Sequence, residues 1–283
     1  MTPFCEKSKS SAAFTLVELL VVVGIIAILA VVVFAAAGTA IQQAHKAQAI
    51  GAARNLITAY LAATDANSGQ LLGGYDRTVN SLSGPGGVTL SGPAAQRYPW
   101  RLSPYLSDDM INSILVGDVA HQIDPTDTYM VSLYPAFGMN YIFVGGDIQS
   151  DGSMTYPGDC ITRMANSAPV IVFASACGDG SGNPNGDGSA GSKVSGYCIL
   201  TPPNLTSSMW NSAAWNKNSS PSDYGNVDAR YNGKAVCAFL DGSVRMESID
   251  ELRDMRLWSR TAAQTGNPNY TVTDTTQRGG RQH

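Results

Sequence analysis

Residues suited to acid–base chemistry are scarce in this chain. Three histidines occur in 283 residues, at His45, His121 and His283. His121 has Asp118 and Asp124 nearby, and a carboxylate can orient an imidazole as a general base. The sequence has no Gly-x-Ser-x-Gly nucleophile motif. We therefore expect His121 to be a solvated loop histidine and the protein not to be an enzyme.

One Gly-rich loop offers oxygen ligands of the kind that calcium prefers. Asp179, Asn183, Asn185 and Asp187 lie in the segment 178–192. Their spacing does not match an EF-hand. We expect no cofactor, and weak calcium binding through Asp179 and Asp187 is the alternative.

The five cysteines fall in two groups. Cys5 precedes a long apolar run, and the other four lie far beyond it, at Cys160, Cys177, Cys198 and Cys237. Their spacings match no Cys-x-x-Cys metal pattern. We predict one or two disulfides among these four cysteines in an oxidising compartment, with buried free thiols as the alternative.

The apolar run extends from Phe14 to Ala37, and Glu18 is its only ionisable residue. A helix of this length spans about 36 Å, enough to cross a hydrocarbon core of about 30 Å. A secretory signal peptide cut after Ala37, a plain anchor and a buried core helix are alternative interpretations. None of them needs a carboxylate near the start of the run, and such a residue in a membrane segment is a functional candidate.

The string Ala13-Phe14-Thr15-Leu16-Val17-Glu18 resembles the processing site of type IV pilins and type II secretion pseudopilins. The resemblance implies a leader at 1–13, which a prepilin peptidase removes between Ala13 and Phe14 before the new amine is methylated. Ala13 stands where the family usually has Gly. The family also implies that Glu18 faces the amine of a neighbouring subunit and guides assembly.

Further expectations follow from this resemblance. They are a single-pass inner-membrane protein with an extracytoplasmic head, an inner-membrane assembly platform and other pilin or pseudopilin subunits as partners, and a filament as the product. A membrane-anchored module that binds polysaccharide or a surface ligand without polymerising is the alternative. Aromatic side chains can stack on sugars, but we expect the four tryptophans to pack in the core: Trp100, Trp210, Trp215 and Trp258.

The predicted helix continues beyond the apolar run. Residues 39–66 contain no Pro and are rich in Ala, Gln and Leu, so we predict one transmembrane and assembly helix over 14–66. An apolar patch at helical spacing, Leu56, Ile57, Tyr60 and Leu61, is expected to dock the head.

A β-rich head is predicted over 67–260, followed by a mobile polar tail over 261–283, and residues 67–130 receive no assignment. Short apolar runs between Gly, Pro, Asn and Ser clusters indicate strands. The predicted strands are 129–133, 140–144, 170–174, 196–200, 234–240 and 243–247. The expected fold class is α+β, a long N-terminal helix packed on an antiparallel sheet.

The clearest local signal is Asp241-Gly242 between two of these runs, which favours a type I′ hairpin turn. Ser248 and Glu251 then form a capping-box pattern for a helix to about Leu257. This region resembles the C-terminal H-x9-DG element of a family of bacterial outer-domain proteins with pilin-type N-termini. Tyr231 occupies the position of the family's His, so the resemblance extends to the hairpin and not to imidazole chemistry.

The charge balance excludes one class of function. The formal net charge is −4 and the isoelectric point is about 5.3. No cluster of Lys and Arg provides the basic surface that binding of DNA or RNA requires.

Overall fold

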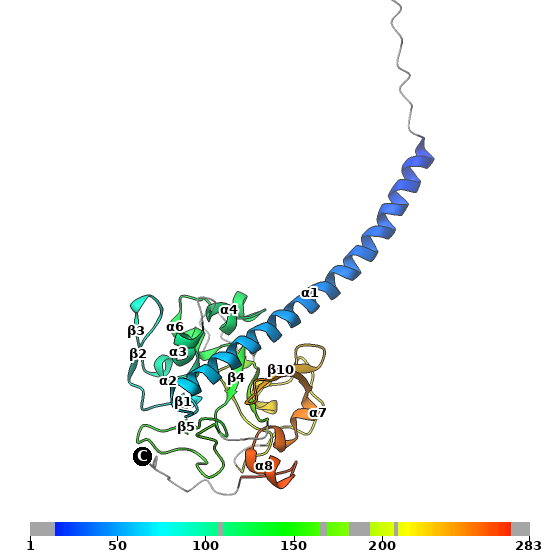
Figure 1. The fold of residues 1–283 in the computed structure, drawn as a ribbon. Helices are drawn as coiled ribbons and strands as arrows, with labels where there is room; N and C mark the ends of the chain where they lie inside the picture. Colours follow the sequence, from blue (N-terminus) through cyan, green and yellow to red (C-terminus); the bar gives the residue numbers. More distant parts are fainter. Residues whose placement is uncertain (1–14, 107–109, 165–168, 181–192, 207–208, 273–283) are drawn as a thin grey trace, which may run out of the picture. The chain divides into compact units, whose positions relative to one another are not determined.

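Helix α1 covers Leu16–Ala66 (Figure 1), which confirms the predicted long helix. The computed structural model describes residues 15–106, 110–164, 169–180, 193–206 and 209–272. The chain forms two units, Met1–Ala44 and His45–His283, and α1 contributes residues to both.

The end of α1 follows from its last residues. The N–H of Gly69 donates to the carbonyl of Thr64 at 2.8 Å, and Ser68 and Gly69 both have a positive φ, of 54° and 80°. Gly adopts such a conformation without steric cost and commonly ends helices. The sequence Asp-Ala-Asn-Ser-Gly therefore stops the helix at Ala66, the predicted end.

A five-stranded sheet forms the centre of the second unit, in the order β11-β10-β6-β4-β9. Its strands are β4 (Phe137–Asn140), β6 (Ile171–Ser175), β9 (Ile199–Leu200), β10 (Lys234–Phe239) and β11 (Val244–Ser248). All neighbouring pairs are antiparallel except β4–β9, which is parallel. The α+β fold with a largely antiparallel sheet agrees with the prediction.

The sheet is covered on both faces. Along β10, Val236 and Ala238 belong to the core cluster that includes the second half of α1, whereas Cys237 and Phe239 belong to a cluster with the C-terminal helices. Such alternation is what a strand's period of two produces. The docking patch on α1 is confirmed, because Leu56, Ile57 and Tyr60 are at most 1% exposed.

Shorter elements surround the sheet, and many of them lie in the previously unassigned region 67–130. The strands are β1 (Tyr75–Asp76), β2 (Ser81–Ser83), β3 (Thr89–Ser91), β5 (Asp147–Ile148), β7 (Gly178–Asp179) and β8 (Lys193–Val194). The α-helices are α2 (Pro93–Gln96), α3 (Tyr98–Leu102), α4 (Met110–Ile114), α5 (Val119–Gln122), α6 (Thr128–Leu133), α7 (Ile249–Leu252) and α8 (Arg260–Thr265). The 3-10 helices are η1 (Pro85–Gly87), η2 (Ser103–Tyr105), η4 (Pro221–Tyr224) and η5 (Met255–Leu257).

Two predicted strands are wrong or displaced. Residues 129–133 belong to helix α6, because Asp127 caps its start by accepting hydrogen bonds from the N–H groups of Tyr129 and Met130 at 3.1 and 3.0 Å. The strand predicted at 140–144 lies earlier, as β4. A local cap overrode the strand preference of the first segment.

The β10–β11 hairpin is present, but its turn is not type I′. Gly242 has a φ of 83°, whereas Asp241 has no positive φ, and the N–H of Gly242 donates to the carbonyl of Phe239 at 2.9 Å. This is the longer loop in which an αL glycine follows the turn. Asp241 Oδ1 accepts from the N–H of Ser243 at 2.9 Å, which stabilises that alternative.

A type I′ turn occurs instead at Asn232-Gly233, where φ is 55° and 76°. Tyr231 and Lys234, on either side, exchange two backbone hydrogen bonds of 3.1 Å. Asn-Gly is the strongest short hairpin signal, so this turn was readable from the sequence. It leads directly into β10.

The C-terminal boundary needs correction. The capping box at Ser248 and Glu251 is confirmed at the start of α7, although a 3-10 helix, η5, replaces the last part of the predicted helix. Helix α8 then covers Arg260–Thr265, and Val272 is fully buried. The head therefore continues to at least Val272, beyond the predicted boundary at residue 260.

Candidate functional site

The start of α1 is built as a capping box. Glu18 Oε2 accepts hydrogen bonds from the backbone N–H and the hydroxyl of Thr15, both at 2.8 Å, and Thr15 Oγ1 accepts from the N–H of Glu18 at 3.3 Å. This reciprocal pairing satisfies backbone donors that the first helical turn leaves free. Thr15 thus positions the Glu18 carboxylate.

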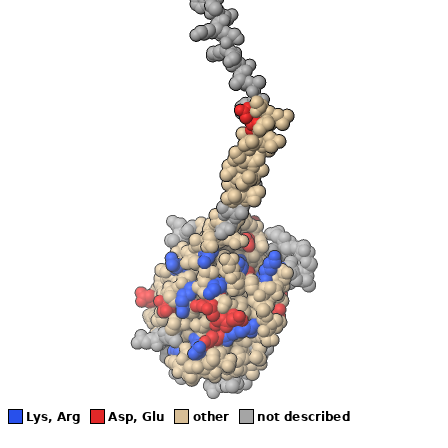
Figure 2. Space-filling view, turned by 90° about the vertical axis from the view of Figure 1, so that its right-hand side faces the viewer, with Lys and Arg blue, Asp and Glu red and all other residues tan. Residues whose placement is uncertain are grey.

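The following turns are apolar and uncovered. The segment Leu16–Val33 has a mean hydropathy of 3.2, and none of it is buried. It is long and apolar enough to cross a membrane. Glu18 is the only Asp, Glu, Lys or Arg between Leu16 and Ala44, and Figure 2 shows the exposed helix as tan apart from an acidic spot near its start.

The comparison with known families finds a match over the same residues that form the capping box and most of the exposed apolar segment. Residues 8–34 match the prokaryotic N-terminal methylation motif. The match includes Ala13, Phe14 and Glu18, and it supports a prepilin-like precursor that a prepilin peptidase processes and a membrane anchors. It points to a structural protein. Neither the search of curated proteins nor that of solved structures returned a significant match.

The methylation motif ends at residue 34, so other predicted sites rest on the structure alone. The bond between Ala13 and Phe14 lies outside the described residues. The resemblance of the C-terminal hairpin to an H-x9-DG element stays a prediction. Tyr231, which stands where that family has His, is half-buried, and this burial raises the pKa of its hydroxyl.

Among the residues that the structure describes, no hydrogen bond or ion pair joins the side chain of His121 to the carboxylate of Asp118 or Asp124. His121 is exposed on α5. Asp124 instead accepts hydrogen bonds from the N–H and hydroxyl of Thr126 at 2.8 and 2.7 Å, and the backbone bond is the main reason why its pKa is lowered. This carboxylate stabilises a turn.

The predicted disulfides are not formed. Cys160, Cys177, Cys198 and Cys237 are all buried free thiols. Burial raises the pKa of Cys177 to about 12 and that of Cys198 to about 11, and it raises those of Cys160 and Cys237 further. Thiols with such pKa values are protonated at neutral pH and are poor nucleophiles. Here cysteine acts as a small core residue.

The calcium prediction remains open. Asp179 lies exposed at the end of β7, whereas Asp187 lies outside the described residues. Among the residues that the structure describes, no group of three His, Cys, Asp or Glu side chains could hold a metal ion.

The tryptophans do not form a sugar-stacking surface. Trp100, Trp210 and Trp258 are at most 7% exposed, and Trp210 and Trp258 pack edge to face at 5.8 Å. Only Trp215 is partly exposed. Core packing, the expected role, is confirmed for three of the four.

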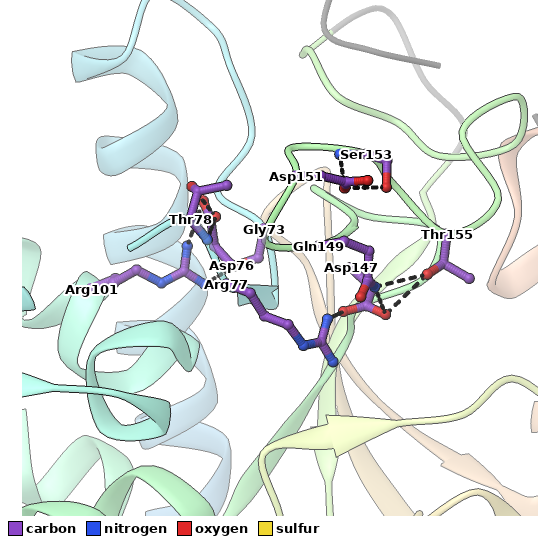
Figure 3. A network of polar contacts seen from close by, with 10 residues as sticks. All are labelled: Gly73, Asp76, Arg77, Thr78, Arg101, Asp147, Gln149, Asp151, Ser153 and Thr155. Atoms are coloured by element: carbon purple, nitrogen blue, oxygen red, sulfur yellow. Dashed lines mark hydrogen bonds and ion pairs between the residues drawn. The ribbon is translucent and has the colours of Figure 1, made fainter. Parts of the chain in front are cut away.

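A polar network joins β1 to β5, and sequence reasoning missed it (Figure 3). Asp147 accepts hydrogen bonds from Arg77 Nη1 at 2.5 Å and from Gln149 Nε2 and Thr155 Oγ1 at 3.0 Å each. Its carboxylate is therefore well satisfied, and its role is to hold the two short strands together.

A second charged pair lies beside this network and is less satisfied. Arg101 Nη1 on α3 lies 3.8 Å from Asp76 Oδ2 on β1, and both side chains are about nine-tenths buried. The two residues are far apart in the sequence and carry no recognisable motif. Only the fold brings them together, at the wall of a pocket with a volume of about 270 Å³.

Proposed function

We propose that this chain is a pilin-like structural subunit of a type II secretion pseudopilus or a type IV pilus-like filament. After cleavage between Ala13 and Phe14, the subunit waits in the inner membrane, with its head on the extracytoplasmic side. Its N-terminal helix then enters the filament through an assembly platform. The observation that carries the proposal is a single carboxylate, Glu18, in the exposed and otherwise uncharged segment Leu16–Val33 of α1, which lies within the methylation motif.

The proposed mechanism uses the new amine. Cleavage places a positive charge on Phe14, one helical turn from Glu18. In a bundle of apolar helices the dielectric constant is low, so an amine of one subunit and a carboxylate of the next attract strongly and oppose a mismatched register. The Thr15 cap holds the Glu18 carboxylate at the start of the helix until a neighbouring amine competes for it.

Substitution of Glu18 tests the proposal. We expect Glu18→Ala and Glu18→Gln to insert into the membrane and to be lost from the sheared filament fraction. Ile25→Ala, on the same exposed helix, is the matched control and is expected to assemble. The glutamine keeps an oxygen that can cap the helix and removes only the charge.

Three measurements in the native host are needed, namely membrane fractionation, N-terminal sequencing and quantification of the filament fraction. Normal assembly of Glu18→Gln together with loss of Glu18→Ala would assign Glu18 to capping and contradict the charge-pairing mechanism. Normal assembly of both variants would contradict the assembly role altogether.

A further inference from the structure

The pocket at the end of α1 has one apolar wall and one polar wall. It has a volume of about 270 Å³. Ala63 and Ala66 of α1 contribute small apolar surface, and Asp76, Arg101 and Tyr105 contribute polar or aromatic groups. A concave site with a few convergent polar groups is the usual form of a small-molecule site.

The charged pair in this wall has unused bonding capacity. Arg101 Nη2 donates to the carbonyl of Gly73, and Arg101 Nε donates to the carbonyl of Arg97 at 3.5 Å. Asp76 Oδ1 accepts from the N–H and hydroxyl of Thr78 at 3.1 and 2.5 Å. Arg101 Nη1 and Asp76 Oδ2 are left facing each other at 3.8 Å. That separation exceeds a hydrogen bond, which is roughly 2.7–3.2 Å.

Arg101 Nη1 and Asp76 Oδ2 are not among the fully buried side-chain atoms that lack a hydrogen-bond partner, so both retain access to solvent in the pocket. Burial lowers the pKa of Arg101 to about 10, and the nearby Asp76 carboxylate only partly opposes the shift. An oxygen of a ligand in the pocket can accept a further hydrogen bond from this guanidinium. Figure 3 shows the Arg101 side chain extending toward Asp76 and Thr78. The gap between Arg101 Nη1 and Asp76 Oδ2 therefore lies between α3 and β1.

The gap selects one kind of group. An atom between Nη1 and Oδ2 must accept from Arg101 and donate to Asp76, and a hydroxyl oxygen does both. An amide divides these roles between its oxygen and its nitrogen. Asp76 repels an anion in this position, and Arg101 repels a cation.

Other residues that line the pocket also suit a ligand with several hydroxyl groups. Asn67 and Gln70, just beyond the C-terminal end of α1, carry amide groups that both donate and accept. Tyr105 is 40% exposed, which leaves part of its ring free for an apolar ligand face. Neighbouring hydroxyls around a ring with an apolar face are the features of a sugar.

We propose that this pocket binds one ring of a neutral saccharide, with a ring hydroxyl bridging Asp76 and Arg101 and the ring face against Tyr105. The site lies entirely within the unit His45–His283. Binding therefore does not require assembly, and it adds a ligand to the proposed filament subunit.

Saturation-transfer NMR on the full chain in lipid nanodiscs tests the proposal. Nanodiscs avoid detergents with sugar headgroups, which would compete. The probes are the methyl glycosides of glucose, galactose, mannose and N-acetylglucosamine, together with glucuronic acid and glycerol. We expect at least one neutral glycoside to bind in the millimolar range, about −4 kcal/mol, and glucuronic acid and glycerol to bind at least tenfold more weakly.

Variants locate the site. Tyr105→Ala and Asp76→Asn are expected to weaken glycoside binding about tenfold, whereas Tyr105→Phe keeps the ring and is expected to retain binding. Tyr129→Ala is the matched control, because Tyr129 is similarly exposed, at 44%, and lies outside this pocket. Tryptophan fluorescence checks that each variant is folded.

Three results would overturn the proposal. They are no binding of any neutral glycoside, tighter binding of glucuronic acid or glycerol, and binding that survives in folded Tyr105→Ala. Each can be observed in membrane-inserted monomers, so failure of this inference is distinguishable from failure of filament assembly.

Discussion

The two halves of α1 belong to one continuous helix and have opposite surroundings. From Leu16 to Leu29 every side chain is exposed, whereas Ala49, Ala53, Leu56 and Tyr60 are fully buried. The first half is apolar on all sides. The second has its apolar residues at helical spacing, with exposed Arg54, Asn55 and Thr58 between them.

This difference shows how one helix can serve two environments. A stripe of apolar residues on one side suits a single packed face, here the sheet of the head. An apolar surface on all sides needs a medium that surrounds it, either lipid or other helices. The pattern of apolar residues sets which half is covered by the chain itself.

The largest expected contrast concerns thiol chemistry. In the chain that starts at Phe14 after the proposed cleavage, and so lacks Cys5, we expect the four buried head thiols to react with a maleimide on the order of a thousandfold more slowly than in guanidinium. Burial raises their pKa values, and reaction waits for an opening that costs roughly 5 kcal/mol or more in a typical domain. Intact-mass spectrometry counts the labels. Thiols that stay unlabelled in guanidinium until reductant is added would indicate disulfides and contradict the free-thiol structure.

A matched pair of leucine substitutions compares the two halves directly. Leu56→Ala is expected to lower the free energy of unfolding of the head by about 2–5 kcal/mol, because it leaves a cavity in the core. Leu29→Ala, at a side chain that is 58% exposed, is expected to leave it unchanged. All four tryptophans lie in the second unit, so guanidinium titration followed by tryptophan fluorescence reports on the head. Equal changes in the free energy of unfolding for Leu56→Ala and Leu29→Ala would contradict the difference between the two halves of α1.

Glycines give a second, smaller contrast. Gly145 has a φ of 71°, and a Cβ there would overlap the carbonyl oxygen of Leu72. We expect Gly145→Ala to destabilise the head by at least about 1–3 kcal/mol. Gly51, on α1, has open space, so Gly51→Ala is expected to stabilise by about 0.5–1 kcal/mol. The same titration measures both changes. Destabilisation by Gly51→Ala would contradict the open space around Gly51.

The two capping boxes offer the finest test. Ser248→Ala removes the cap of α7 and is expected to cost about 1 kcal/mol of head stability. Thr15→Ala removes the equivalent cap at the start of α1 and is expected not to change head unfolding. A shift of the head's unfolding midpoint in Thr15→Ala would mean that the two units are energetically coupled.

Much of the fold could be predicted from strong local patterns. The long helix, its stop at Asp65–Gly69 and the capping box at Ser248 depend on residues that are close together in the sequence. Strands β6 and β10 are nearly continuous apolar runs, as expected for strands buried on both faces. The strand predicted over 129–133 is wrong because the cap at Asp127 outweighs the strand-like composition of the segment, which forms α6.

Other features depend on distant contacts and left no local trace. Asp76 and Arg101 are brought together only when α3 folds beside β1. The four thiols suggested disulfides by number and compartment, whereas the packing of each one in the core decides its state. The short elements of residues 67–130 are too brief for a periodicity to show.

The central claim is tested most directly by the N-terminus of the protein in its own host. The intact mass and N-terminal sequence of the membrane-extracted chain are the measurements. The account predicts a start at Phe14 with one added methyl group. A start after Ala37, or an uncut chain beginning at Met1, would contradict it.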